Sequence, residues 1–357
     1  MANISVRCGV ALGLRASNLL CIVNSDSALS VAVAAHYRTR RALNANQFLE
    51  LSLPLPSNNQ MTPAQYATLS AAIEAYITSS GLPVKCLVMM PDIPVSVCWP
   101  DLSLMGVDNN LAVGYPTVVS GQGQILESGY HSFYGATQHP FTDYVQDRSK
   151  GNSATFRLVS RLDGPGVDAE AREACIKGLI DSAVDNDGLG MLGKFYFDKT
   201  ANLDLWWAAY DAQLAAGATA ATAKGKTSVL EPTVSRQVFD GAAGFYHGGY
   251  TNPPAFQVAQ SPFNLGSIAA ELQSGGGIRL DVLNNGYLYM LCADYIRQGV
   301  AGTWGPVGEP GLASFPNVSQ MLAALFLGLT WGEAWWLSNP YVGWKQYMVG
   351  DPLYRPF

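Results

Sequence analysis

Apolar residues along the chain fall into short continuous runs that alternate with longer segments of helical periodicity. Residues 19–23 (LLCIV) and 86–90 (CLVMM) are runs of the first kind, and each is followed by polar or turn-forming residues. Such runs are typical of strands buried on both faces of a parallel sheet. Between them, Thr62 and Pro63 begin a segment of helical periodicity, with proline in the first turn. The alternation of strand and helix predicts an α/β protein with a doubly wound sheet.

The same reading extends to the rest of the chain. The predicted strands are residues 19–23, 48–53, 86–90, 155–160, 194–197, 242–246, 267–272, 300–304 and 347–349. The first predicted helix follows N-cap candidates at residues 24–27 and runs to about residue 41. The other predicted helices are residues 62–76, 168–187, 204–216, 285–298, 318–327 and 330–337. Residues 215–226 (AAGATAATAKGK) are low in complexity and predict a flexible connection. Residues 99–152 lose all periodicity, so we expect an N-terminal half (1–98), an irregular insertion (99–152) and a C-terminal half (153–357).

Composition adds an expectation about assembly. Charged residues make up 13% of the chain, about half the average share, and hydrophobic residues 48%. We therefore expect part of the surface to be covered by copies of the same chain, as in a homo-oligomer. The cluster Trp331, Trp335, Trp336, Tyr341, Trp344 and Tyr347 would be the first interface to test, although tryptophans at helical spacing are more often core.

Charge and cysteine usage exclude several classes of function. The net charge of −6 is spread without blocks of one sign, so we expect no nucleic-acid partner. No apolar run reaches the roughly 18 residues of a spanning helix. The N-terminal apolar stretch lacks a clear cleavage site, which favours a cytoplasmic protein over an exported one. Six cysteines lie far apart without CxxC spacing, which indicates core thiols; we expect no metal and no cofactor.

Residues 241–277 contain the most informative pattern. Two predicted strands each end in a chemically capable residue followed by glycine: His247 before Gly248, and Ser274 before Gly275. The carboxyl ends of parallel strands are where α/β proteins bind ligands. If the two strands are neighbours, this pattern predicts that His247 and Ser274 lie at one edge of the sheet.

Four segments carry a family resemblance. VNSDSALSVAVAAHYRTRRAL, VSRLDGP, GTWGPVGEP and VGDPLYRPF resemble the exosortase-associated family of bacterial proteins, over residues 18–357. More distantly, the chain is similar to gingipain-type and caspase-type cysteine peptidases, where one strand ends in His-Gly and the next in the nucleophilic cysteine. His247-Gly248 matches the first element, and the Gly350-Asp351-Pro352 segment matches the end of the gingipain branch. The resemblance implies a three-layer α/β fold, with a mostly parallel sheet and two Rossmann-like halves of caspase-hemoglobinase type.

The chain departs from those peptidases at the nucleophile, where it has Ser274 in place of cysteine. Two hypotheses follow. The first, which we favour, is a peptidase-like protein without catalysis that self-associates as a structural or scaffold protein. The second is a hydrolase acting on peptide bonds, with His247 as base, Ser274 as nucleophile and the N–H groups of Gly248 and Gly275 as oxyanion donors. Under either hypothesis the protein could bind a peptide or protein ligand.

Three further residues are candidates for a site. Glu309 in GPVGEPG could act as an acid or base, or accept hydrogen bonds from loop amides. Arg161 and Asp163 in SRLDGP could orient a substrate, with the Arg161 fork suited to a carboxylate such as Glu309. We favour a structural turn for this segment, in which Asp163 caps the helix that begins near residue 168.

Overall fold

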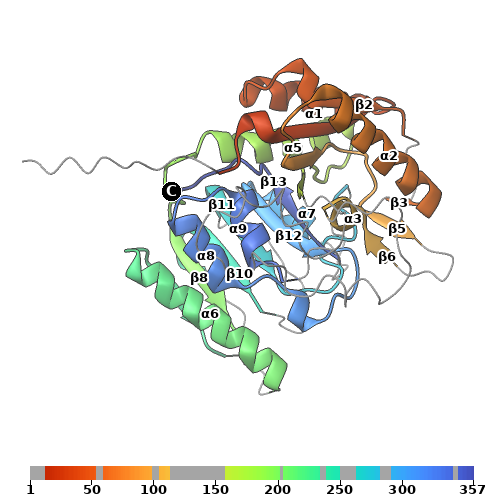
Figure 1. Cartoon of the computed structure of the whole chain (residues 1–357). Coiled ribbons are helices and arrows are strands. Elements are labelled where there is room, and N and C mark those ends of the chain that lie inside the picture. The colour runs from red at the N-terminus through yellow and green to blue at the C-terminus, as the bar shows by residue number, and fades with distance from the viewer. Residues whose placement is uncertain are drawn as a thin grey trace, which may run out of the picture.

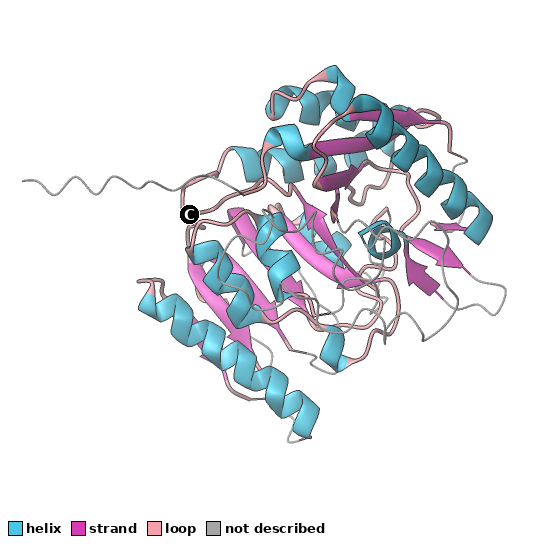
Figure 2. Cartoon of the chain, viewed as in Figure 1, coloured by secondary structure: helices cyan, strands magenta, loops and turns pink. Residues whose placement is uncertain are grey.

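The computed structural model describes residues 13–53, 59–98, 104–112, 157–201, 204–233, 239–249, 263–281, 291–340 and 345–357. Its centre is a ten-stranded sheet in the order β2-β1-β4-β7-β13-β12-β11-β10-β8-β9 (Figure 1). On one face α5 contacts α1 and α7, and on the other face α8 contacts α6 and α9 (Figure 2). The architecture is the three-layer α/β arrangement that the sequence predicts.

The strands of the large sheet are short and mostly buried. They are β1 (Leu19–Asn24), β2 (Phe48–Leu51), β4 (Cys86–Met89), β7 (Leu158–Arg161), β8 (Lys194–Asp198), β9 (Ser228–Glu231), β10 (Ala243–Gly248), β11 (Phe263–Glu271), β12 (Gly302–Pro306) and β13 (Gln346–Gly350). A second sheet has the order β3 (Gln60–Met61), β5 (Ser96–Cys98) and β6 (Leu104–Gly106). The α-helices are α1 (Ala28–Arg40), α2 (Pro63–Ser80), α3 (Val107–Ala112), α5 (Ala169–Val184), α6 (Leu205–Ala223), α7 (Leu291–Arg297), α8 (Val318–Phe326) and α9 (Trp331–Ser338).

Strand direction divides the large sheet into two parallel halves. Every neighbouring pair from β2 to β13 is parallel, and so is every pair from β12 to β9. The pair β12–β13 alone is antiparallel within this sheet, with Gly302 opposite Gly350 and Pro306 opposite Gln346. The carboxyl ends of the two halves therefore lie at opposite edges of the molecule.

Glycines permit close packing at this antiparallel pair. A Cβ on Gly302 would lie 2.8 Å from Nε1 of Trp331, and the indole N–H of Trp331 donates to the carbonyl of Val349 at 3.2 Å. Gly350 has φ +121°, and a Cβ there would lie 2.5 Å from the carbonyl oxygen of Ala301. Residues with a Cβ rarely adopt that backbone conformation, so both the φ angle of Gly350 and its close packing against Ala301 require glycine.

The C-terminal segment, residues 351–357, contacts both halves of the sheet. The buried Asp351 accepts a hydrogen bond from the Tyr37 hydroxyl at 2.7 Å and forms an ion pair with Arg41. Three residues later, the Tyr354 hydroxyl donates to the carbonyl of Gly266, in β11, at 2.5 Å. One short segment thus contacts α1 of the first half and β11 of the second.

Two local expectations are corrected by the structure. Residues predicted to form a flexible connection continue α6 as far as Ala223. Alanine has the highest intrinsic helix propensity, and Gly217 lets the helix pack on β8, since a Cβ there would lie 2.9 Å from Phe197. Within the insertion predicted to be irregular, the described residues form β6 and the buried α3.

The aromatic cluster is also different from the interface we expected. Trp331, Trp335, Trp336 and Tyr347 are all buried within the chain, while Tyr341 and Trp344 lie outside the described residues. These four side chains are therefore core residues and offer no surface to a second copy.

The five described cysteines are free, as the sequence predicts. In the described parts of the chain, no helix combines the length and apolar composition needed to cross a membrane.

Candidate functional site

His247 lies near the carboxyl end of β10, between β8 and β11, where it pairs with Phe197 and Ala270. Aromatic side chains from α6 and β12 lie against its ring. The Tyr210 hydroxyl lies 3.4 Å from Nε2, and the Trp304 ring centroid is 5.3 Å from that of the imidazole. Phe315 packs edge-on against both Trp304 and Tyr210. The result is an apolar box around a polar ring.

This enclosure determines the charge state of His247. The side chain is 1% exposed, and burial lowers the pKa of His247 from 6.5 to about 3. Among the residues that the structure describes, Nδ1 has no hydrogen-bond partner. A general base works best with a pKa near the operating pH, whereas an imidazole in this state is neutral and weakly basic.

Ser274 lies in the turn after β11 and is partly exposed. Its hydroxyl donates to a carboxylate oxygen of Glu309. The other oxygen of Glu309 accepts the N–H of Gly311 at 3.0 Å, and Lys345 donates to the Glu309 carbonyl at 3.0 Å. The structure thus brings together two of the predicted site residues, Ser274 and Glu309, and positions the carboxylate with a loop amide.

The glycines after Ser274 use their N–H groups within the protein. Gly275 donates to the carbonyl of Gly308 at 3.0 Å, and Gly277 donates to that of Pro306 at 3.0 Å. Gly248 contributes its carbonyl to the N–H of Leu272 at 2.9 Å. An oxyanion could take the Gly275 N–H only if this turn changed its conformation.

His247 and Ser274 are brought to the same end of adjacent strands, because β10 and β11 are parallel neighbours. Within the described residues, however, no hydrogen bond joins the two side chains. His247 interacts with Tyr210 and Trp304, and Ser274 with Glu309. The arrangement contains the residue types of a dyad without the proton-transfer contact that a dyad uses.

Arg161 is fully buried at the end of β7 and forms an ion pair with Asp108 of α3. Its guanidinium also donates to the carbonyls of Ile93 and Pro94 and lies 5.8 Å from the Tyr347 ring centroid. The carboxylate partner is therefore Asp108, and the pairing we considered with Glu309 is wrong. Sequence reasoning missed Asp108 in this role because it precedes Arg161 by 53 residues and lies on a helix that the periodicity does not predict.

Asp163 has a different partner from the one we expected. It accepts the N–H of Gly164 at 2.8 Å and pairs with Arg172 at 2.7 Å. The helix cap is Asp168, whose side chain accepts the N–H of Ala171. Arg172 also pairs with Asp92, which has a left-handed φ of 61°. Asp163 thus holds α5 through an ion pair and does not cap it.

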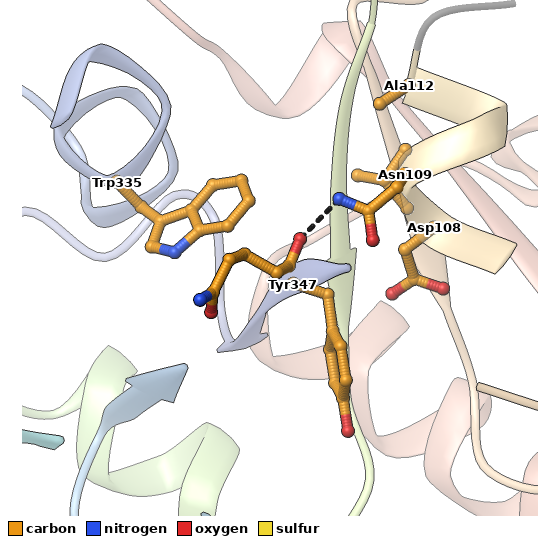
Figure 3. Close-up of a pocket in the computed structure, with 7 residues that line it drawn as sticks. Asp108, Asn109, Ala112, Trp335 and Tyr347 are labelled. Atoms are coloured by element: carbon orange, nitrogen blue, oxygen red, sulfur yellow. Dashed lines mark hydrogen bonds between the residues drawn. The ribbon is translucent and has the colours of Figure 1, made fainter. Parts of the chain in front are cut away.

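A small cavity lies beside the Arg161–Asp108 pair, at the contact between α3, α9 and β13 (Figure 3). Its lining includes Gln346 and Trp335. Within the described parts of the chain, the Gln346 amide oxygen and nitrogen and the Trp335 indole N–H have no hydrogen-bond partner. The volume of about 10 Å³ is roughly that needed by one water molecule. The orphaned amide makes a bound water, rather than an apolar ligand, the fitting occupant.

The described residues contain no group of three His, Cys, Asp or Glu side chains close enough to hold a metal ion. Asp92 and Asp163 lie close to each other, and Arg172 pairs with both. At the carboxyl edge of the second half, Ser274, Glu309 and Lys345 are joined by hydrogen bonds.

Comparisons with known proteins bear on the fold. No protein-family model matches the chain, and no curated protein matches it. A solved structure named "Structure of Protease" is similar with a TM-score of 0.55 at 10% sequence identity, covering 97% of this chain and 80% of that one. At such low identity the likeness shows a shared fold alone. The protein has a peptidase-like α/β fold.

Proposed function

We propose that the protein uses this peptidase-like fold without peptidase chemistry and acts as a self-associating structural or scaffold protein. The observation that supports the proposal is the separate engagement of His247 and Ser274. The imidazole lies in the box of Tyr210 and Trp304, and the serine hydroxyl donates to Glu309. The motifs VSRLDGP and VGDPLYRPF further support membership of the exosortase-associated family as part of this proposal.

Self-association is supported by the low charge of the chain and by its exposed leucines. Leu189, Leu192 and Leu265 are each more than half exposed. The carbonyl of Leu192 accepts the Asn264 side-chain amide at 2.7 Å, which brings the loops before β8 and at the start of β11 together. Size-exclusion chromatography with light scattering tests this part of the proposal, and a monomer at every concentration would remove it.

A second candidate function is hydrolysis of peptide bonds, with Ser274 as the nucleophile. The specific observation in its favour is the hydrogen bond from Ser274 to Glu309, since a carboxylate can accept the proton that an attacking serine loses. In this version Glu309 takes the role that we assigned to His247, and Lys345 lies beside the pair.

Labelling with a serine-directed fluorophosphonate separates the two functions. The non-catalytic proposal expects no labelling above background in wild type, Ser274→Ala, His247→Ala and Glu309→Gln. Labelling of wild type that disappears in Ser274→Ala would establish a reactive serine and overturn the proposal. A subsequent loss in Glu309→Gln but not in His247→Ala would identify Glu309 as the base.

A further inference from the structure

A pocket of about 460 Å³ lies where the two ends of the described chain meet, next to the end marked C in Figure 1. Residues 14–16 form one wall, and the other walls come from Asp187, Gly188 and the C-terminal residues Leu353, Arg355 and Phe357. This volume falls within the range of small-molecule sites. Its lining residues include neither Ser274 nor its partners Glu309 and Lys345.

The backbone around Arg355 is held firmly by the loop after α5. Its N–H donates to Asp187 at 2.8 Å, and its carbonyl accepts the N–H of Gly188 at 2.8 Å. The next carbonyl, that of Pro356, accepts the N–H of Gly190 at 2.6 Å. The position from which the Arg355 side chain leaves the backbone is therefore fixed before any ligand arrives.

The Arg355 guanidinium has no carboxylate partner among the described residues. Its Nε is buried and makes no hydrogen bond. Asp187, which carries the carboxylate side chain of the pocket wall, is already used: one oxygen is paired with Arg41 and the other accepts the Arg355 N–H. Arg15 adds a second positive charge to the lining. The pocket thus offers a planar donor fork to a negatively charged group.

The remaining lining is apolar. Leu14 is 3% exposed, while Leu353 and Phe357 are half-buried against the core. Phe357 packs on Phe326, with ring centroids 4.9 Å apart, which holds its ring in place. A ligand that placed an oxyanion on Arg355 would lay any attached hydrocarbon on these three side chains.

We propose that this pocket binds a carboxylate attached to an apolar group, with Arg355 as the residue that recognises the carboxylate. Both a peptide with a free C-terminal carboxylate and an aliphatic acid have this chemistry. The inference does not depend on the proposed function, because it uses none of the residues near Ser274.

Isothermal titration calorimetry of the full chain tests the proposal with N-acetyl-Leu-Phe, its C-terminal amide, decanoate and inorganic phosphate. We expect the free dipeptide to bind and the amide to bind at least about tenfold more weakly, because a charge-assisted hydrogen bond is lost. Binding of decanoate without the dipeptide would assign an aliphatic source, and binding of the dipeptide without decanoate a peptide source; either result, or binding of both, supports the shared chemistry. Equal binding of acid and amide, no binding of either acid, or phosphate binding as tightly as the acids would overturn it.

Variants locate the site. Arg355→Gln should weaken the acid that binds by about tenfold or more, whereas Arg38→Gln should leave it unchanged. Arg38 is an exposed arginine of α1, so this control removes the same charge elsewhere. If Arg355→Gln does not fold, Arg355→Lys keeps the charge without the planar fork, and it should still weaken binding about threefold or more. Unchanged affinity in the variant that folds would overturn the assignment.

Discussion

The imidazole of His247 and the indole of Trp304 lie against each other from strands two places apart, with ring centroids 5.3 Å apart. Between them runs β11, where Ala270 pairs with His247. Since Ile268 pairs with Gly302, the register also aligns Ala270 with Trp304. The small alanine leaves room for the two rings to meet above it. The histidine is thereby a packing residue of the sheet face that α6 covers.

The first prediction concerns the pH dependence of stability. The pKa of His247 is 6.5 when unfolded and about 3 when folded, so between these values the unfolded chain binds the proton and the folded chain does not. The contribution of His247 to the free energy of unfolding should fall by up to about 1.4 kcal/mol for each pH unit below 6.5. His247→Phe removes this contribution. Urea unfolding of both proteins from pH 8 to pH 4 should show the variant gaining on wild type as the pH falls; a constant difference would contradict the burial effect.

The second prediction concerns the buried ion pair of Arg161 and Asp108. Arg161→Met should lower the free energy of unfolding by about 3–5 kcal/mol, because it leaves a buried carboxylate without its partner. The double variant Arg161→Met with Asp108→Leu should recover much of the loss, since no charge is then buried. Chemical denaturation measures both. If the double variant is as unstable as the single one, the loss comes mainly from the hydrogen bonds that Arg161 donates to the carbonyls of Ile93 and Pro94, and the unpaired Asp108 carboxylate contributes little.

The third prediction compares two glycines. Gly350→Ala should destabilise the protein by more than about 2 kcal/mol, because φ is +121° and the new Cβ would lie 2.5 Å from the carbonyl oxygen of Ala301. Gly178→Ala is the matched control, as Gly178 lies within α5 and a Cβ there meets nothing within 4 Å. The control should stabilise by about 0.5–1 kcal/mol. Thermal unfolding of the two variants should therefore move the midpoint in opposite directions.

The fourth prediction concerns Asp351 at the start of the C-terminal segment. Asp351→Ala leaves the partly buried Arg41 without one of its two carboxylates and the Tyr37 hydroxyl without an acceptor, so a loss of about 3 kcal/mol or more is expected. Tyr37→Phe removes the neutral contact alone and should cost about 1 kcal/mol. Equal losses in the two variants would mean that the ion pair adds nothing to stability. Equilibrium unfolding in urea distinguishes the outcomes.

Much of the fold could be predicted because its buried strands are marked in the sequence by short, continuous apolar runs. The apolar runs at residues 19–23, 86–90 and 194–197 became β1, β4 and β8 with bounds within about a residue. The Thr62-Pro63 start of α2 is a capping box, with the Thr62 side chain accepting the N–H of Gln65. The edge strand β9 was not predicted, because its residues SVLE are only half-buried and form no continuous apolar run.

The site was harder to predict because its contacts join distant parts of the chain. The sequence brings His247 and Ser274 to adjacent strand ends, as β10 and β11 show, but strand order does not determine where a side chain points. The aromatic box depends on Tyr210 from α6 and Trp304 from β12, neither of which has a local signal. Likewise, the partner of Arg161 lies on α3, within residues that we predicted to be irregular.

The position of β13 has a consequence for the order of folding. It follows every other strand along the sequence, yet it pairs β7 on one side and β12 on the other, in the middle of the sheet. Until residues 346–350 are available, β7 and β12 can each present an unpaired edge, and such edges invite association with other chains. Joining the halves also requires contacts between residues far apart in sequence, which slows folding. A chain truncated before Gln346 should therefore aggregate through these two edges rather than accumulate as a stable half-sheet.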